Sequence, residues 1–157
     1  MIKVNVLETH TDWKKILKNS PNYLKKKIKA LNNKSQFFKK KKLEFSIVLS
    51  STKEIKNLNK KFRNKNKSTD VLSFPFYEKK ILLKLLKKKN LKIYLGDIVI
   101  NIKKIPFKNN LKDFQKKFDE LWIHGLAHLL GGRHKTNKDF NSMSRVEKKF
   151  LNIIKKK

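Results

Sequence analysis

One stretch of this sequence, LWIHGLAHLLGGRH at residues 121–134, constrains the fold more than any other. It is apolar enough to form a buried helix, and a helix places residues four positions apart on one side. His124 and His128 therefore present their imidazoles to the same point. The glycines at 131–132 predict the end of the helix, because glycine enters the left-handed conformation there without strain. The chain can then fold back and bring His134 to the same point.

Three converging imidazoles with no further protein ligand are typical of a catalytic zinc site, in which water occupies the open position. A single histidine on an apolar helix more often has no metal role. Three histidines at this spacing, with a glycine turn between the second and the third, reverse that expectation, and His10 is the only other histidine. The chain has no cysteine, which excludes a structural zinc site with cysteine ligands. The sequence predicts one Zn²⁺ ion bound by His124, His128 and His134.

The spacing also matches the zinc-protease pattern H-E-x-x-H-x-x-G-x-x-H. In those enzymes the glutamate that follows the first histidine acts as the general base. Gly125 stands at that position here, and glycine cannot take a proton. A zinc protease is therefore disfavoured. In a hydrolase of another kind, water activated by the metal or a different residue must do that work.

The length of 157 residues predicts a single domain, 1–157, large enough to bury a substantial core. No run of about 18 apolar residues is present, so we expect no transmembrane helix and no membrane partner. The first residues lack the apolar segment of a signal peptide. Together with the absence of cysteine, these features predict a soluble cytoplasmic protein.

The formal net charge of +30 has two interpretations. A strongly basic protein attracts nucleic acid, which would make RNA the partner. However, 39 of the 42 basic residues are lysines, and asparagine, isoleucine and phenylalanine are also abundant, as compositional drift toward AT-rich codons would produce. Charge alone is therefore a weak indication of an RNA partner. The chain has three arginines, Arg63, Arg133 and Arg145. They are more informative than the lysines, because they have remained arginine in a chain whose composition has drifted toward lysine.

The pattern of apolar and polar residues predicts strands alternating with helices in an α+β (mixed α/β) fold, a small mixed sheet packed with helices. The expected strands are residues 2–9, 43–50, 71–74 and 94–102. The expected helices are residues 12–17, 21–31, 51–62, 110–130 and 139–154. The lysine run 39–42 is expected to be a solvated loop. The basic amphipathic segment 78–92 favours an expanded surface connection over a helix lying on a membrane.

The histidine-bearing helix is expected to begin near Asn109 or Asn110, since asparagine is a good N-cap. Its core face is a stripe at helical spacing, with the histidines on its flank: Phe114, Phe118, Leu121, Trp122, Gly125 and Leu129. The last helix is expected to pack through Phe140, Met143, Val146, Phe150 and Ile153. We expect the terminal lysines, 155–157, to be disordered.

A second informative stretch is LNKKFRNKNKSTDVLSFPF, residues 58–76. Arg63 lies where a helix should end beside a basic loop, and its planar guanidinium matches the oxygens of a phosphate. The structural alternative is an arginine that caps backbone carbonyls or pairs with Asp70. The role of Asp97 also has two interpretations: it either orients something in a cleft or is a structural aspartate with its hydrogen bonds satisfied.

The stretches LNKKFRNKNKSTDVLSFPF and HGLAHLLGGRH, with LGDIVI between them, resemble the YbeY family of single-strand-specific endoribonucleases, also called rRNA maturation factors. The resemblance implies a small mixed sheet with helices around it. It also implies zinc ligands at His124, His128 and His134 and a basic residue needed for RNA cleavage at Arg63. The function it implies is maturation of the 3′ end of small-subunit (16S) rRNA and ribosome quality control, with ribosomal proteins as partners. Lys65, Lys67 and Arg133 are further candidates for contact with single-stranded RNA.

The sequence departs from the family at G-Y-D-H, which is Gly131, Gly132, Arg133 and His134 here. A carboxylate that could orient a ligand or accept a proton is therefore missing. Loss of such a partner typically costs about 10–100-fold in metal affinity or activity. The departure leaves open an alternative from another class, an RNA-binding or ribosome-binding assembly factor with a vestigial metal site. It also leaves open whether water or the RNA 2′-hydroxyl is the nucleophile.

Overall fold

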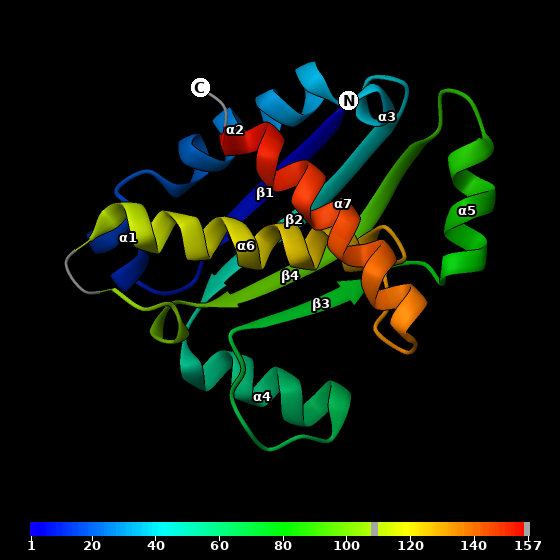
Figure 1. Ribbon diagram of the computed structural model, residues 1–157. Helices are drawn as coiled ribbons and strands as arrows, with labels where there is room; N and C mark the ends of the chain where they lie inside the picture. The colour runs from blue at the N-terminus through cyan, green and yellow to red at the C-terminus, as the bar shows by residue number, and fades with distance from the viewer. Residues whose placement is uncertain (108–109, 156–157) are drawn as a thin grey trace.

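The computed structural model describes residues 1–107 and 110–155 (Figure 1). Strands and helices alternate along the described chain. In order they are β1 (Ile2–Glu8), α1 (Asp12–Ile16), α2 (Ser20–Lys34), α3 (Gln36–Lys39), β2 (Lys42–Ser50), α4 (Thr52–Arg63), β3 (Val71–Pro75), α5 (Lys79–Lys87), β4 (Lys92–Asn101), the 3₁₀ turn η1 (Ile102–Lys104), α6 (Leu111–Leu129) and α7 (Asn137–Lys155).

The described strands form one mixed sheet in the order β1-β2-β4-β3. β1, β2 and β4 run parallel, and β3 runs antiparallel to β4 at the edge. Successive side chains of a strand point to opposite faces of a sheet. Ile98 and Ile100 of β4 accordingly belong to the main core, whereas Val99 packs with Leu72 and Ile55 in a smaller cluster on the other face. This arrangement confirms the mixed α+β fold.

The helices divide between the two faces of the sheet. α6 crosses the main-core face in contact with β3 and β4, and α7 and α2 pack beside it (Figure 1). α4 covers the smaller cluster through Ile55. The start of α4 follows the expected capping box, because the backbone N–H of Ser51 donates to the carboxylate of Glu54 at 3.1 Å. The sheet thus separates α4 from the histidine-bearing helix.

The lysine run at 39–42 differs from the expected loop. α3 ends at Lys39 and β2 begins at Lys42, so two of its residues belong to regular structure. Phe38 explains the short helix, since its ring is fully buried against Phe150 at a centroid distance of 5.2 Å. Segment 78–92 contains α5, a surface helix whose buried residue is Leu82. Of the helices in the described residues, none has the length and apolar character needed to cross a bilayer.

The core face predicted for α6 is confirmed, because all six residues of that stripe are buried. In α7, Met143 and Phe150 are buried as expected, and Val146 and Ile153 pack against the core. The prediction for Phe140 is wrong: its side chain is 57% exposed. α7 begins two residues earlier than expected, and Phe140 lies in a first turn beside the ring of His134, at a centroid distance of 6.0 Å. The terminal lysines were expected to be disordered, which is wrong for Lys155 because it belongs to α7, and 156–157 lie outside the described residues.

Candidate metal centre

Local hydrogen bonds explain why α6 begins and ends where it does. The side chain of Asn110 accepts from the backbone N–H groups of Lys112 and Asp113, which confirms the expected N-cap. At the other end Gly131 has φ +92°, a conformation that side chains rarely tolerate. The N–H of Gly132 then donates to the carbonyl of Ala127 at 2.9 Å. This turn reverses the chain after α6 and carries it back toward the helix.

The turn brings the three histidines together as the sequence predicts. One ring nitrogen of each residue lies within 4.8 Å of those of the other two. The Nε2 atoms of His124 and His128 are 3.2 Å apart. Two nitrogens bound to one tetrahedral zinc ion, each at about 2.0–2.1 Å, lie roughly 3.3 Å apart, so this spacing fits zinc. His134 completes the cluster from the exposed side.

Hydrogen bonds at the opposite ring nitrogens orient the two helical imidazoles. The Nδ1 of His124 lies 2.9 Å from Oε1 of Glu147 on α7, and the Nδ1 of His128 lies 3.0 Å from the carbonyl of Gly132. Both partners accept, so each Nδ1 carries the proton and each Nε2 keeps a free lone pair. Two lone pairs that face each other at this distance repel one another, and a cation bound between them would remove that repulsion. The donor set therefore suits a metal ion.

Burial keeps His128 in the form that binds metals. Removal from water lowers the pKa of the His128 imidazole below its usual range, and the hydrogen bond to Gly132 opposes this shift only in part. A lower pKa favours the neutral imidazole at neutral pH, and only the neutral ring can donate its lone pair to a metal ion.

Glu147 is the site residue that sequence reasoning missed. The motif at 131–134 indicated that the carboxylate orienting a ligand was lost, yet α7 supplies one to His124. The signal available in the sequence was faint: Glu147 is one of two acidic residues in the predicted helix 139–154, the other being Asp139. Its position beside His124 depends on the packing of α7 against α6, which the sequence pattern does not specify.

We expect Glu147→Gln to weaken zinc binding by about 10-fold or more, because the amide still accepts a hydrogen bond but no longer carries the charge that raises ligand basicity. Competition with a chromophoric chelator measures this affinity. Glu120→Gln is the matched control, since Glu120 lines the same cleft as His124, whereas the carboxylate that accepts the hydrogen bond from that imidazole belongs to Glu147. Equal zinc affinity in the two variants would contradict the role of Glu147.

Gly125 is explained by the contact between α6 and the sheet. A Cβ atom at this position would lie 2.7 Å from Cγ2 of Ile98, whose side chain is fully buried on β4. A side chain at this position would force Ile98 or the helix itself to shift. The glutamate that a zinc protease carries after its first histidine therefore has no room here, which argues against a protease from geometry as well as from sequence.

Arg63 is linked to this centre through the sheet. Its guanidinium, at the exposed end of α4, donates to the carbonyl of Ser73 at 3.3 Å. Ser73 on β3 pairs with Ile98, the residue that packs against Gly125 of α6. The structure thus shows the carbonyl-capping alternative for Arg63. Asp70, the other alternative partner, accepts hydrogen bonds from the Val71 N–H and the Thr69 hydroxyl.

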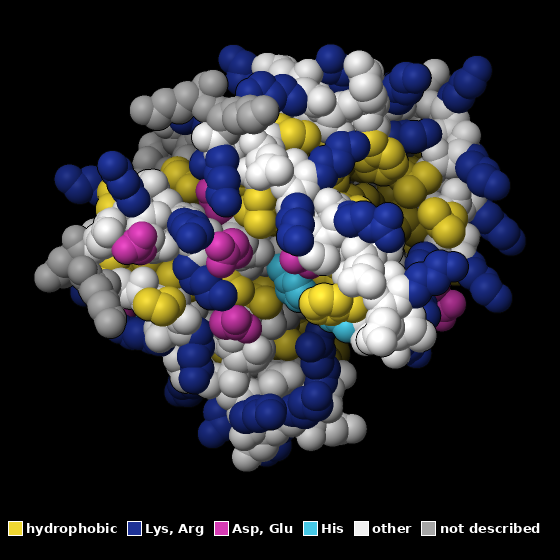
Figure 2. Space-filling model, viewed as in Figure 1, with side chains coloured by type: hydrophobic (Ala, Val, Ile, Leu, Met, Phe, Trp, Pro, Cys, Tyr) yellow, Lys and Arg dark blue, Asp and Glu magenta, His cyan; other side chains and the backbone are white. Residues whose placement is uncertain are grey.

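The other candidate residues are distributed unevenly around the centre. Lys65 and Lys67 are exposed in the loop after α4, and Arg133 is exposed next to His134. Figure 2 shows the histidine side chains in a hollow near the middle of this face, with Lys and Arg side chains close by. Asp97 lies apart from them on the face that α4 covers, where it accepts a hydrogen bond of 2.7 Å from Tyr94. Asp97 is therefore a satisfied structural residue.

A cleft opens next to the cluster. It has a volume of about 440 Å³, and its wall includes His124, Glu147 and Asp70. The three histidines are not sealed in the core, because His134 is exposed and the other two are half-buried. A flexible polymer can reach the open side of the cluster from this cleft.

Fold and site together define a class: small α+β proteins that hold a three-histidine metal centre on one helix and the turn that follows it. A model of the family described as endoribonuclease YbeY matches residues 7–155. The chain therefore belongs to the YbeY family of endoribonucleases, hydrolases that act on RNA.

Individual relatives agree with this assignment. The endoribonuclease YbeY of Pelagibacter ubique is 43% identical over 100% of this chain and 99% of its own length. That of Buchnera aphidicola from Schizaphis graminum is 40% identical over 88% of this chain and 86% of its own. The solution structure of TM1509 from Thermotoga maritima superposes with a TM-score of 0.55 at 25% identity, covering 98% of this chain and 89% of that one.

Proposed function

We propose that this protein is a zinc-dependent endoribonuclease that cuts single-stranded RNA in maturing the 3′ end of small-subunit (16S) rRNA and in ribosome quality control. Residues 1–157 form the endoribonuclease domain in this proposal. The protein would work in the cytoplasm, with the ribosome or ribosomal proteins as partners. The observation that carries the proposal is the convergence of the Nε2 atoms of His124 and His128, 3.2 Å apart, with His134 beside them, in an open hollow.

The chain's own groups have separate tasks in this reaction. His124, His128 and His134 would hold the zinc ion, which when bound supplies Lewis acidity toward a phosphate oxygen and lowers the pKa of water. Glu147 and the Gly132 carbonyl keep two of the imidazoles in the ligating tautomer.

The basic residues bind and orient the RNA. Arg63 would stabilise the charge that builds on the phosphate oxygens as the bond breaks. Lys65, Lys67 and Arg133 would attract the RNA backbone, since all three are exposed. The bond is broken by attack of either water or the RNA 2′-hydroxyl, and the products distinguish the two. Attack by the 2′-hydroxyl leaves a 2′,3′-cyclic phosphate, whereas attack by water leaves a linear one.

The role of Arg63 is tested by Arg63→Ala. Loss of a donor that stabilises transition-state charge typically costs about 10²–10³-fold in rate. We expect cleavage of single-stranded RNA to fall by that factor while zinc content stays unchanged, with partial recovery in Arg63→Lys. Arg145→Ala is the matched control, because Arg145 is an exposed arginine that donates to a backbone carbonyl on α7. Unchanged cleavage in Arg63→Ala with zinc still bound would refute the assignment.

The second candidate is an RNA-binding or ribosome-binding assembly factor with a vestigial metal site. Arg133, where the family has aspartate, favours it, because a positive charge beside His134 opposes metal binding and attracts phosphate. This candidate predicts zinc-independent RNA binding without cleavage. Parallel measurements of zinc content, RNA binding and RNA cleavage on one preparation separate the two.

A further inference from the structure

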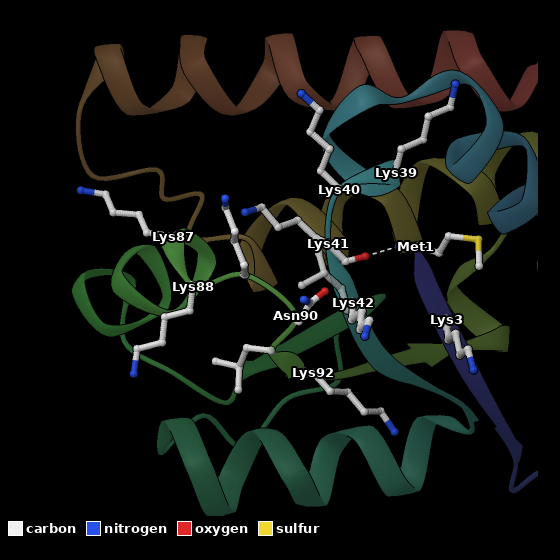
Figure 3. A pocket seen from close by; sticks show the side chains of 13 residues that line it. Met1, Lys3, Lys39, Lys40, Lys41, Lys42, Lys87, Lys88, Asn90 and Lys92 are labelled. Atoms are coloured by element: carbon white, nitrogen blue, oxygen red, sulfur yellow. Dashed lines mark hydrogen bonds between the residues drawn. The ribbon is translucent and has the colours of Figure 1, made fainter.

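A second basic concavity lies away from the histidine cluster. We name it the lysine pocket; it has a volume of about 850 Å³ (Figure 3). Nine of the described residues that line it are lysines, and none of the described lining residues is acidic. The lining residues are Met1, Lys3, Lys39, Lys40, Lys41, Lys42, Leu43, Lys87, Lys88, Lys89, Asn90, Leu91 and Lys92.

Folding assembles the lysine pocket from chain segments that are distant in sequence. The start of β1, the α3–β2 junction and the α5–β4 junction meet at the ends where the parallel strands begin. Figure 3 shows Lys39 and Lys40 on one side of the pocket and Lys87 and Lys88 on the opposite side. Such a cluster of like charges costs free energy, and a bound anion reduces that cost.

The charge of the pocket is only slightly neutralised by neighbouring groups. Glu44 pairs with Lys92 at 2.7 Å and lies opposite Lys3 in the sheet, and it is one carboxylate beside nine lining lysines. Burial and the charge of Lys42 lower the pKa of the Met1 amino group, a sign of the positive potential there. Because a concave surface focuses the field of its charges, an anion is drawn to this pocket more strongly than to the lysines scattered elsewhere.

The backbone under the lysines is held in place. The Met1 amino group donates to the carbonyl of Lys41, and the Lys41 ammonium donates to the carbonyl of Leu86 at the end of α5. The Ile2 N–H donates to the Asn32 side chain at 2.7 Å. The backbone that carries these lysines is therefore held in place by hydrogen bonds. Their flexible side chains let the ammonium groups adjust to an irregular polyanion.

α5 connects the lysine pocket to the metal centre. At its start the side chain of Lys79 lies against Gly131, in a cleft that Arg133 also lines. At its end Lys87 lines the lysine pocket. A helix of nine residues is about 13 Å long, so a polymer a few nucleotides in length spans the distance. Lys80 and Lys84 add positive charge along the way.

We propose that the lysine pocket is a second RNA-contact site, which binds the phosphate backbone of the single strand on one side of the bond cut at the metal centre. Cleavage at that bond rests on the proposed function, whereas binding of RNA in the pocket does not. Lysine is a point charge without the planar fork that arginine offers, so the contact is expected to follow the backbone and to be indifferent to base sequence.

The test uses full-length protein and fluorescently labelled single-stranded RNA of two lengths, with chelator present to prevent cleavage. One is a dinucleotide, which is too short to span α5, and the other is a strand of about 16 nucleotides, which reaches both sites. Lys40→Glu combined with Lys88→Glu reverses one charge on each side of the pocket. Lys25→Glu combined with Lys29→Glu makes the same charge change on the exposed surface of α2 and is the control. Fluorescence anisotropy gives Kd at several salt concentrations for each protein.

Relative to the control, the pocket variant should bind the longer RNA about 10-fold more weakly. The slope of log Kd against log salt concentration should fall by about 1.4, which is about 0.7 for each of two lost phosphate contacts. The loss for the dinucleotide should be smaller, because that RNA contacts only one of the two sites at a time. Replacing Lys40 and Lys88 with glutamine should give an intermediate loss. Equal weakening in the pocket variant and the control overturns the proposal.

Two further measurements distinguish RNA binding in the pocket from lipid binding and from cleavage at the metal centre. If the pocket variant loses binding to vesicles containing phosphatidylglycerol but keeps its affinity for the long RNA, the pocket is a lipid site and the proposal is wrong. Cleavage of the RNAs by zinc-loaded wild-type protein is measured independently. Pocket-dependent RNA binding without any cleavage would support the second contact site and contradict the proposed function.

Discussion

Replacing His128 with alanine should abolish stoichiometric zinc binding and, with it, cleavage of single-stranded RNA. His128 contributes one of two Nε2 atoms that lie 3.2 Å apart, and it is the half-buried ligand whose lowered pKa keeps it neutral. Loss of an outer hydrogen bond to a ligand already costs about 10–100-fold in metal affinity, so loss of the ligand itself should exceed about 100-fold. Elemental analysis of the purified protein gives the zinc content directly.

His10→Ala is the matched control, because His10 lies outside the cluster beside Asp12. Wild type and His10→Ala should each contain about one zinc ion per chain and gain thermal stability when zinc is added. A ligand at about 100 times its Kd stabilises the folded state by about 2.7 kcal/mol, a shift that His128→Ala should lose. If His128→Ala retained a full equivalent of zinc, the three-histidine centre would be wrong. If wild type took up no zinc, the entire site would be refuted.

Gly125→Ala should destabilise the protein by about 2 kcal/mol, although alanine is the better helix former. The added methyl group would lie 2.7 Å from Cγ2 of Ile98 and 3.0 Å from Cδ1. Ile98 is fully buried and β-branched, so it has little freedom to move aside. Overpacking of a tight core costs about 1–3 kcal/mol, and here the close contacts favour the upper end. The greater helix propensity of alanine relative to glycine offsets about 1 kcal/mol of this cost.

The control for this prediction is a double-mutant cycle, measured by chemical denaturation. Ile98→Ala removes the atoms that meet the new methyl group at its own cost of about 2–5 kcal/mol. In the Ile98→Ala background, Gly125→Ala should be neutral or stabilising, and the coupling energy should exceed about 1 kcal/mol. Additive effects of the two substitutions would show that α6 does not rest on β4 at this point. The zinc content of Gly125→Ala reports whether the new methyl group displaces α6 far enough to misplace His124.

Residues close together in the sequence determined much of this protein. The i, i+4 spacing of His124 and His128, the glycine turn and the asparagine cap are local features, and the structure has all of them as predicted. The strands were equally predictable, because alternating β-branched residues bounded by polar ones suit only a strand. Gly125 was visible as a departure from a protease motif before its contact with Ile98 gave the reason.

Only the tertiary structure decided the contacts between distant segments. Glu147 meets His124 across 23 residues of sequence. Phe140 was expected in the core because its position fits the apolar stripe, but the first turn of α7 extends beyond the sheet and exposes it. The lysine pocket joins residues from three separate segments. Two of them, the lysine run 39–42 and the basic segment 78–92, were predicted only as surface features, and nothing in the sequence indicated that they meet. Periodicity specifies which face of an element is buried, whereas the neighbours of each side chain depend on how the elements pack.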